Sequence, residues 1–353
     1  MFGERFFIEK TIQKQLKKHR AEFNGSDEEF RVSMNEKLPK AIEGITAGII
    51  EEIWDYCISN KTDLKKRERK ISKNIKNNYG AGIKIFEAFI ELNSKISSIT
   101  YESNYKAFDT REAHLKLDTL VSIHVRACQI ANEIKTLVAN GYADGAHARW
   151  RSLHELCVIF LFLYDNDYET VQMFNDYEVI EDWKKAKEYR ENYEELNLHP
   201  LSDEEWKDIE LRRELMIKKY GKDFSGKNGW TIKALPKWRN FTDIEKAVSK
   251  DYLRVVYTWA SENIHPGVSG IRSKLGLKDN EQNYFLTGPS DYGFLDPVQY
   301  TAHSLAEMSN TFLDMEDSMM NKTFRELLLI FQEGLVEEFQ VQQEKIEKDS
   351  ELK

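Results

Sequence analysis

A chain of 353 residues is long enough to bury a large core, and 31% charged with 41% hydrophobic residues is typical of a soluble globular protein rich in surface helices. Six prolines and 17 glycines are few for this length, which favours an all-α protein over many short strands. A formal net charge of −9 argues against a generic polyanion binder, although a local basic patch can still bind nucleic acid.

The three cysteines, Cys57, Cys128 and Cys157, lie far apart and form no C-x-x-C pair. They are typical of reduced residues in a cytosolic protein and do not indicate a zinc or redox site. Residues 1–20 contain scattered charges and no continuous apolar segment, so neither a signal peptide nor a membrane anchor is indicated. We therefore expect a cytoplasmic protein.

Residues 1–80 are predicted to form an N-terminal helical region. Apolar residues recur at helical spacing from residue 6 to residue 20, and a second helix is expected between Pro39 and Tyr56. Lysine and arginine far outnumber aspartate and glutamate over residues 61–80. This basic stretch either offers a surface to phosphate backbones or an acidic partner, or it is a solvated helix face.

Gly80 and Gly82 are expected to end this region, so we place a domain boundary there, before a helical core domain over residues 81–350. Within the core, Asp109 is expected to cap a long helix, and Ser202, with a glutamate three residues later, starts another helix with a capping box. Helices are predicted over residues 83–99, 109–140, 168–196, 202–220, 242–261, 298–320 and 323–346, and the only strand-like pattern covers residues 283–297.

The stretch from Ala139 to Tyr164 is expected to form the centre of the fold. A glycine-marked joint leads into a polar cluster, and an unbroken apolar run follows from Leu156. A run that is apolar on every side belongs to a helix enclosed by protein, and this run is too short to span a bilayer. The charged residues just before it are therefore expected to enter the core. The polar cluster consists of His147, Arg149, Arg151, His154 and Glu155.

Helical spacing places Arg151, His154 and Glu155 on one face of this central helix. Burial of a guanidinium and a carboxylate is costly without partners, so the face is either a paired structural network or a site. In the first case, Arg151 and Glu155 form an i, i+4 ion pair that receives Ser261 or His265 from a later helix. In the second case, the pair frames an anion-binding or catalytic pocket with His265 as acid or base.

A metal site is a further alternative, because His147, Glu155 and His265 could contribute ligands. No H-E-x-x-H or D-x-D spacing supports it, and the chain contains no P-loop, G-x-G-x-x-G or G-x-S-x-G motif. We therefore expect no metal and no cofactor.

Five short motifs follow one another along the chain: R-S-L-H-E at 151–155, W-T-I-K at 230–233, D-Y-L-R-V-V-Y at 251–257, S-E-N-I-H-P at 261–266 and T-G-P-S at 287–290. This series resembles the bacterial domain of unknown function DUF5677. The likeness covers roughly residues 107–310 and implies an all-helical core, but it implies no activity. The recurrent polar positions of that family match Arg151, Glu155, Ser261 and His265.

The segment from Arg149 to His154, R-W-R-S-L-H, also resembles the R-x-x-x-x-H signature of HEPN ribonucleases. That family cuts RNA without a metal, usually acts as a dimer, and includes many toxins and antiphage effectors. In such chemistry the arginine stabilises the charge that develops on the phosphate, and the histidine moves a proton from the 2′-hydroxyl or to the leaving oxygen. The resemblance implies a metal-independent endoribonuclease with a defence role.

Three functions remain open: this ribonuclease, a non-enzymatic helical module that binds a partner protein or nucleic acid, and a sensor of a small anionic ligand near Arg151. RNA or a partner protein is the expected partner, a homodimer is left open, and no membrane contact is expected. The candidate catalytic residues are Arg149, Arg151, His154, Glu155 and His265. The candidate substrate-binding residues are His147, Ser261, Lys65, Lys66 and Arg67.

Overall fold

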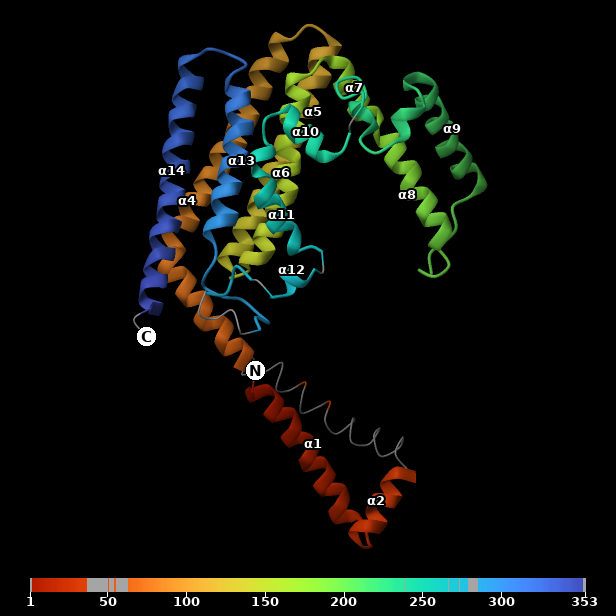
Figure 1. The fold of residues 1–353 in the computed structure, drawn as a ribbon, viewed down its shortest axis with the longest axis vertical. Coiled ribbons are helices and arrows are strands. Elements are labelled where there is room, and N and C mark those ends of the chain that lie inside the picture. The colour runs from red at the N-terminus through yellow and green to blue at the C-terminus, as the bar shows by residue number, and fades with distance from the viewer. Residues whose placement is uncertain are drawn as a thin grey trace. The chain divides into compact units, whose positions relative to one another are not determined.

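The computed structural model describes residues 2–36, 50, 54, 63–237, 239–265, 267–272, 274–278 and 285–351. The chain divides into two compact units, residues 1–74 and residues 75–353, and each is considered by itself. All regular structure in the described residues is helical and none of them lies in a strand, which confirms the predicted all-α class (Figure 1). None of the described helices is both long and apolar enough to cross a bilayer.

The first unit begins with two helices. The helix predicted near the N-terminus is present as α1 (Phe2–Glu22), and α2 (Asp27–Glu36) follows it. Ser26 starts α2 with a capping box: its Oγ accepts from Glu29 N at 3.3 Å, and Glu29 Oε2 accepts from Ser26 N at 2.7 Å. The helix expected over residues 39–56 falls in a segment of which only residues 50 and 54 are described.

Helix α4 (Asp63–Ala107) runs without a break through Gly80 and Gly82, so the separate helix predicted over residues 83–99 is part of a longer one. A Cβ at Gly82 would lie 2.7 Å from Phe339 Cε2 of α14 (Met319–Glu351). The missing side chain therefore allows α14 to approach closely, and this packing offsets the cost of about 1 kcal/mol of a glycine in a helix interior. The domain boundary placed at Gly80 stays a prediction.

Helices α4 and α14 form a bundle with three further helices of the second unit (Figure 1). The central helix, α6, packs on α5 and α13, and most of its apolar run is buried, including Phe160 and Leu163, whereas Leu156, Ile159 and Tyr164 are half-buried. Helix α5 is capped by Thr110, whose Oγ1 accepts from Ala113 N at 3.2 Å, and not by Asp109, because Thr110 is the extended residue directly before the helix. The three helices are α5 (Arg111–Ala139), α6 (Ala143–Asp165) and α13 (Leu295–Leu313).

A buried polar chain joins three of these helices around His124. Ser309 Oγ donates to Asn93 Oδ1 at 2.6 Å, so it accepts the hydrogen bond from His124 Nε2 at 2.8 Å. His124 Nδ1 is then the acceptor for Ser97 Oγ at 2.5 Å. Every bond fits a neutral imidazole, and burial lowers the pKa of His124 to about 3.

We expect this histidine to make the fold sensitive to mild acid. The pKa of His124 is depressed in the folded state, so its contribution is complete above about pH 6.5 and is lost as the pH falls toward 3. Between pH 5 and pH 6, His124→Gln should lower the pH slope of the unfolding free energy by about 1.4 kcal/mol per pH unit. Urea denaturation at both pH values measures this slope. An unchanged slope in His124→Gln, or an equal change in the exposed-histidine control His199→Gln, would contradict the assignment.

The long helix predicted over residues 168–196 is two helices, because the chain turns at Tyr177. This side chain is buried, its hydroxyl donates to Gly226 O at 2.5 Å, and its ring packs edge-on against Phe224. The capping box predicted at Ser202 is confirmed. The helices of this part are α7 (Tyr168–Asp176), α8 (Glu178–Asn192) and α9 (Asp203–Tyr220), of which α8 and α9 pack on each other (Figure 1).

The helix predicted over residues 242–261 is also interrupted, because Ser249 adopts a left-handed φ of 55°. The strand-like pattern forms no strand over the described residues 285–294. Gly293 has a φ of 84° there, and a Cβ would lie 2.0 Å from Leu275 O. The remaining elements are η1 (Lys222–Ser225), η2 (Gly229–Thr231), α10 (Phe241–Ala247), η3 (Asp251–Leu253), α11 (Arg254–Glu262) and α12 (Val268–Arg272).

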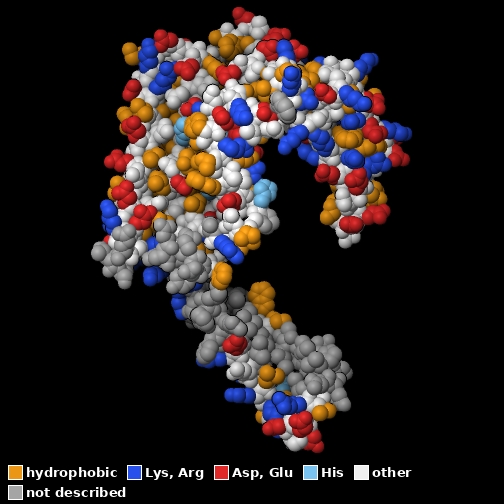
Figure 2. Space-filling model, in the orientation of Figure 1, with side chains coloured by type: hydrophobic (Ala, Val, Ile, Leu, Met, Phe, Trp, Pro, Cys, Tyr) orange, Lys and Arg blue, Asp and Glu red, His pale blue; other side chains and the backbone are white. Residues whose placement is uncertain are grey.

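The visible surface carries both signs of charge. On the face drawn in Figure 2, Lys and Arg side chains lie among Asp and Glu side chains over the bundle and over α8 and α9. A site for an anion therefore has to be sought in particular side chains and not in the overall charge of this face.

Candidate functional site

The two candidate arginines of the central helix contact different neighbours. Arg149 forms an ion pair through Nε with Glu133 of α5, and its Nη1 donates to Ser152 Oγ at 3.2 Å. His154 lies five residues further along α6, which at about 100° per residue places it on another face of the helix. The structure therefore does not bring Arg149 and His154 together.

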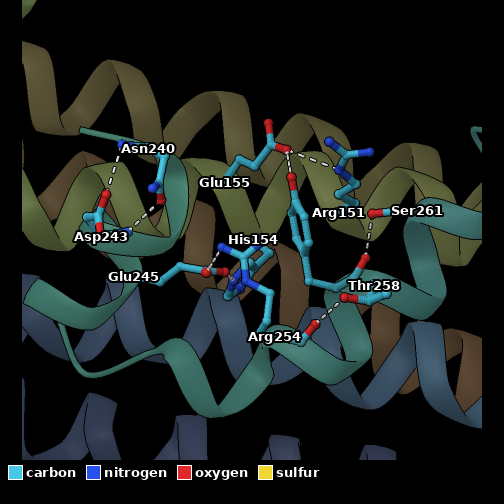
Figure 3. Close-up of polar contacts among 10 residues, drawn as sticks. Arg151, His154, Glu155, Asn240, Asp243, Glu245, Arg254, Thr258 and Ser261 are labelled. Atoms are coloured by element: carbon cyan, nitrogen blue, oxygen red, sulfur yellow. Dashed lines mark hydrogen bonds and ion pairs between the residues drawn. The ribbon is translucent and has the colours of Figure 1, made fainter. Parts of the chain in front are cut away.

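His154, Glu245 and Arg254 form a triad, which we call the buried triad after its two buried members, His154 and Glu245; the side chain of Arg254 is 31% exposed. His154 Nε2 donates to Glu245 Oε1 at 2.9 Å, and the side chains of His154 and Glu245 are 1% and 0% exposed. The other carboxylate oxygen of Glu245 forms an ion pair with Arg254 Nη2. Figure 3 shows the three side chains together, apart from Arg151 and Glu155. Burial of the Glu245 carboxylate is compensated by two partners, so the triad ties α6 to α10 and α11.

Local sequence explains how these two residues reach His154. Asn240 and Asp243 form a capping box that starts α10: Asn240 Oδ1 accepts from Asp243 N at 3.1 Å, and Asp243 Oδ2 accepts from Asn240 N at 3.0 Å (Figure 3). Glu245 follows in the same short helix, and Arg254 is the first residue of α11. The sequence reasoning missed both, although Arg254 lies inside the D-Y-L-R-V-V-Y motif.

A second polar group, which we call the Arg151 cluster, consists of Arg151, Glu155, Tyr257 and His265. Arg151 Nε donates to Glu155 Oε1 at 3.1 Å, and Tyr257 Oη donates to the same oxygen at 2.5 Å. Arg151 Nη1 donates to His265 Nε2 at 3.3 Å. The motif at 151–155 and the end of α11 therefore meet in space.

Solvent reaches the Arg151 cluster. The side chains of Arg151 and Glu155 are 21% and 39% exposed, and His265 is exposed. A guanidinium has five N–H donors, of which the bonds to Glu155 and His265 use two. Burial, assisted by the bond to Glu155, raises the pKa of Tyr257 to about 12, so its hydroxyl remains a donor at neutral pH. Tyr257 thus holds the carboxylate that orients Arg151.

Ser261 and His147 lie beside the Arg151 cluster without joining its hydrogen bonds. Ser261 Oγ donates to Tyr257 O within its own helix at 2.6 Å. His147, one turn before Arg151, is 2% exposed, and burial lowers its pKa to about 4. It lines a pocket of about 750 Å³ together with residues of α11 and α13.

The basic candidates belong to the other compact unit. Lys65, Lys66 and Arg67 are exposed in the first turns of α4, and Lys65 Nζ donates to Glu68 Oε2 at 2.9 Å. Among the described residues, no three or more His, Cys, Asp or Glu side chains are placed to hold one metal ion.

The comparisons with known proteins find a family for the middle of the chain. Residues 117–283 match DUF5677, a family of unknown function, which confirms the first resemblance over a shorter range than expected. The match includes both the Arg151 cluster and the buried triad. No curated protein and no solved structure matches the chain.

Proposed function

We propose that this chain, in which residues 117–283 match the family of unknown function DUF5677, is a cytoplasmic, metal-independent endoribonuclease whose phosphate contacts are Arg151 and His265. The observation that carries the proposal is the 3.3 Å distance between Arg151 Nη1 and His265 Nε2 at a place that solvent reaches. Cleavage of a phosphodiester without a metal requires a group that binds the phosphate and a group that moves the proton. The planar guanidinium of Arg151 and the neighbouring imidazole of His265 are suited to these two tasks.

The reaction can be written with these two side chains. The phosphate takes the place of His265 Nε2 as the acceptor of Arg151 Nη1, so the lone pair of His265 Nε2 is free to accept the proton of the ribose 2′-hydroxyl. The 2′-oxygen then forms a bond to phosphorus while the bond from phosphorus to the 5′-oxygen breaks, and the proton returns from His265 to the leaving oxygen. Arg151 stabilises the extra negative charge on the phosphoryl oxygens between these steps.

Arg149 and His154, which carry the HEPN-like spacing, receive other roles in this proposal. His154 is buried and holds Glu245, and Arg149 pairs with Glu133, so both position the central helix. The resemblance to HEPN ribonucleases supports RNA as the substrate class, a defence or toxin role, and action as a dimer. The Arg151 cluster supplies an arginine and a histidine that can reach RNA together.

The two arginines give a matched test. Purified protein is incubated with total RNA in EDTA, and Arg151→Ala is compared with Arg149→Ala. Loss of one donor to the charged phosphate should slow cleavage by about 10²- to 10³-fold in Arg151→Ala, whereas Arg149→Ala should remain within a few-fold of wild type. The proposal fails if the wild-type chain leaves RNA intact, or if Arg151→Ala cuts as fast as wild type.

A binding module for a small anionic ligand is the second candidate, because the bonds to Glu155 and His265 use only two of the five N–H donors of Arg151 at a place that solvent reaches. Such a module would bind a phosphate ester through Arg151 and cut nothing. An RNA that is retained by the wild-type chain, released by Arg151→Ala, and recovered at full length would favour this function.

A further inference from the structure

A pocket of about 750 Å³ is lined by residues of α6, α11, α12, α14 and the first turn of α13. This size falls within the range of about 300–1,000 Å³ that small-molecule sites occupy. His147 contributes from α6, Trp259 from α11 and Gln343 from α14. Trp259 is 52% exposed, so an aromatic face at the wall of the pocket is open to solvent.

Two polar atoms of residues in this wall are buried and find no hydrogen-bond partner within the part of the chain that the structure describes. They are His147 Nε2 and Gln343 Oε1. Native proteins pair nearly all buried polar groups, so an unpaired one calls for a ligand or water. Because His147 is neutral at physiological pH, its Nε2 can be either donor or acceptor, whereas Gln343 Oε1 can only accept.

The charged residues around the pocket argue against a site for a small free ion. Asp144, Glu262 and Asp296 line it together with Arg272 and Lys274, so both signs are present. Asp144 Oδ1 is already the acceptor for Leu275 N at 3.0 Å. The wall therefore suits the uncharged part of a ligand that carries hydrogen-bond donors and acceptors along one edge, with any anionic group outside the pocket.

We infer that this pocket takes an unpaired nucleobase, stacked on Trp259 and hydrogen-bonded at its edge by His147 and Gln343. Single-stranded RNA is generally read in this way, by an aromatic side chain under the base and polar groups at its edge. This pocket would give the proposed ribonuclease its contact with the base of the substrate, and the inference rests on that proposed function. His147 lies one turn before Arg151, and Asn263 of the pocket lies two residues before His265, so the same two segments supply the base pocket and the phosphate contacts.

The test uses the full chain and small probes. Adenosine, cytidine, guanosine and uridine, and their 5′-monophosphates, are titrated by isothermal calorimetry. At least one nucleoside should bind, and Trp259→Ala should weaken it by about 5- to 150-fold, the effect of losing one stacked base. Gln343→Met removes the acceptor with little change in volume and should also weaken binding. Val255→Ala truncates an equally exposed residue of the same helix outside the pocket and should not.

The outcomes separate this inference from the proposed function. Unchanged melting temperatures in Trp259→Ala and Gln343→Met would show that weaker binding is not a loss of fold. If RNA is cut in EDTA but no nucleoside binds, the base pocket is wrong and the ribonuclease stands. The same holds if both variants bind the nucleoside as tightly as the wild-type chain. If a nucleoside binds in a Trp259-dependent way and RNA stays intact, the pocket stands and the ribonuclease is wrong. Arg151→Ala should keep nucleoside binding and lose the added affinity of the monophosphate.

Discussion

RNA cleavage should fall by about 10²- to 10⁴-fold when His265 is replaced with alanine, because the reaction then lacks the group that accepts and returns the proton. The side chain is exposed and follows the end of α11, so its removal should leave the melting temperature unchanged. Initial rates on a single-stranded RNA in EDTA, at substrate concentrations below and above KM, measure the effect. The loss should appear in kcat.

The variant His265→Gln distinguishes proton transfer by His265 from its hydrogen bond to Arg151. His265→Gln can still accept the hydrogen bond from Arg151 but cannot carry a proton, so it should be as slow as the alanine variant. His199→Ala removes another exposed histidine and should cut at the wild-type rate. If His265→Gln restores most of the activity, His265 positions Arg151 and the proton moves by another route.

Replacing Glu245 with alanine should destabilise the fold by about 1–3 kcal/mol, the cost of leaving a buried hydrogen-bond donor without its acceptor. Arg254 would keep a charge whose partner is lost, and the buried Nε2 of His154 would lose its acceptor. Chemical denaturation with urea, followed by far-ultraviolet circular dichroism, measures the change in unfolding free energy.

The matched control for this variant is Glu155→Ala. Glu155 also bonds an arginine of the site, but it is 39% exposed, and partly exposed ion pairs contribute about 0–1 kcal/mol. A large difference between the two glutamates supports the structural role of the buried triad. Similar losses for both, or a loss below 1 kcal/mol for Glu245→Ala, would show that the triad does not anchor α10 and α11.

The sequence alone predicted the parts of this site that depend on local spacing. The ion pair between Arg151 and Glu155 follows from their i, i+4 positions, and the buried central helix follows from the unbroken apolar run. The approach of His265 to Arg151 was expected as one of two alternatives, and the structure shows the contact.

Glu245 could not be found in the same way. It lies in a segment, F-T-D-I-E-K-A-V-S-K-D, whose dense charges are typical of a solvated helix, yet its side chain is fully buried. Its burial depends on His154, which is 91 residues away in sequence. The periodicity of the residues around Glu245 does not indicate a contact over that distance. The turn at Tyr177 has a similar origin, since its hydroxyl bonds a loop 49 residues away.

The close packing at Gly82 affects how the helices of the bundle assemble during synthesis of the chain. The contact that Gly82 permits joins α4 to Phe339, and Tyr79 of α4 stacks on the same ring at 5.3 Å. On the ribosome, α4 emerges long before α14, so this apolar face of α4 is uncovered while the intervening helices are made. Until α14 is synthesised, this apolar face of α4 can make non-native contacts. In a chain truncated before Phe339, the face would stay exposed.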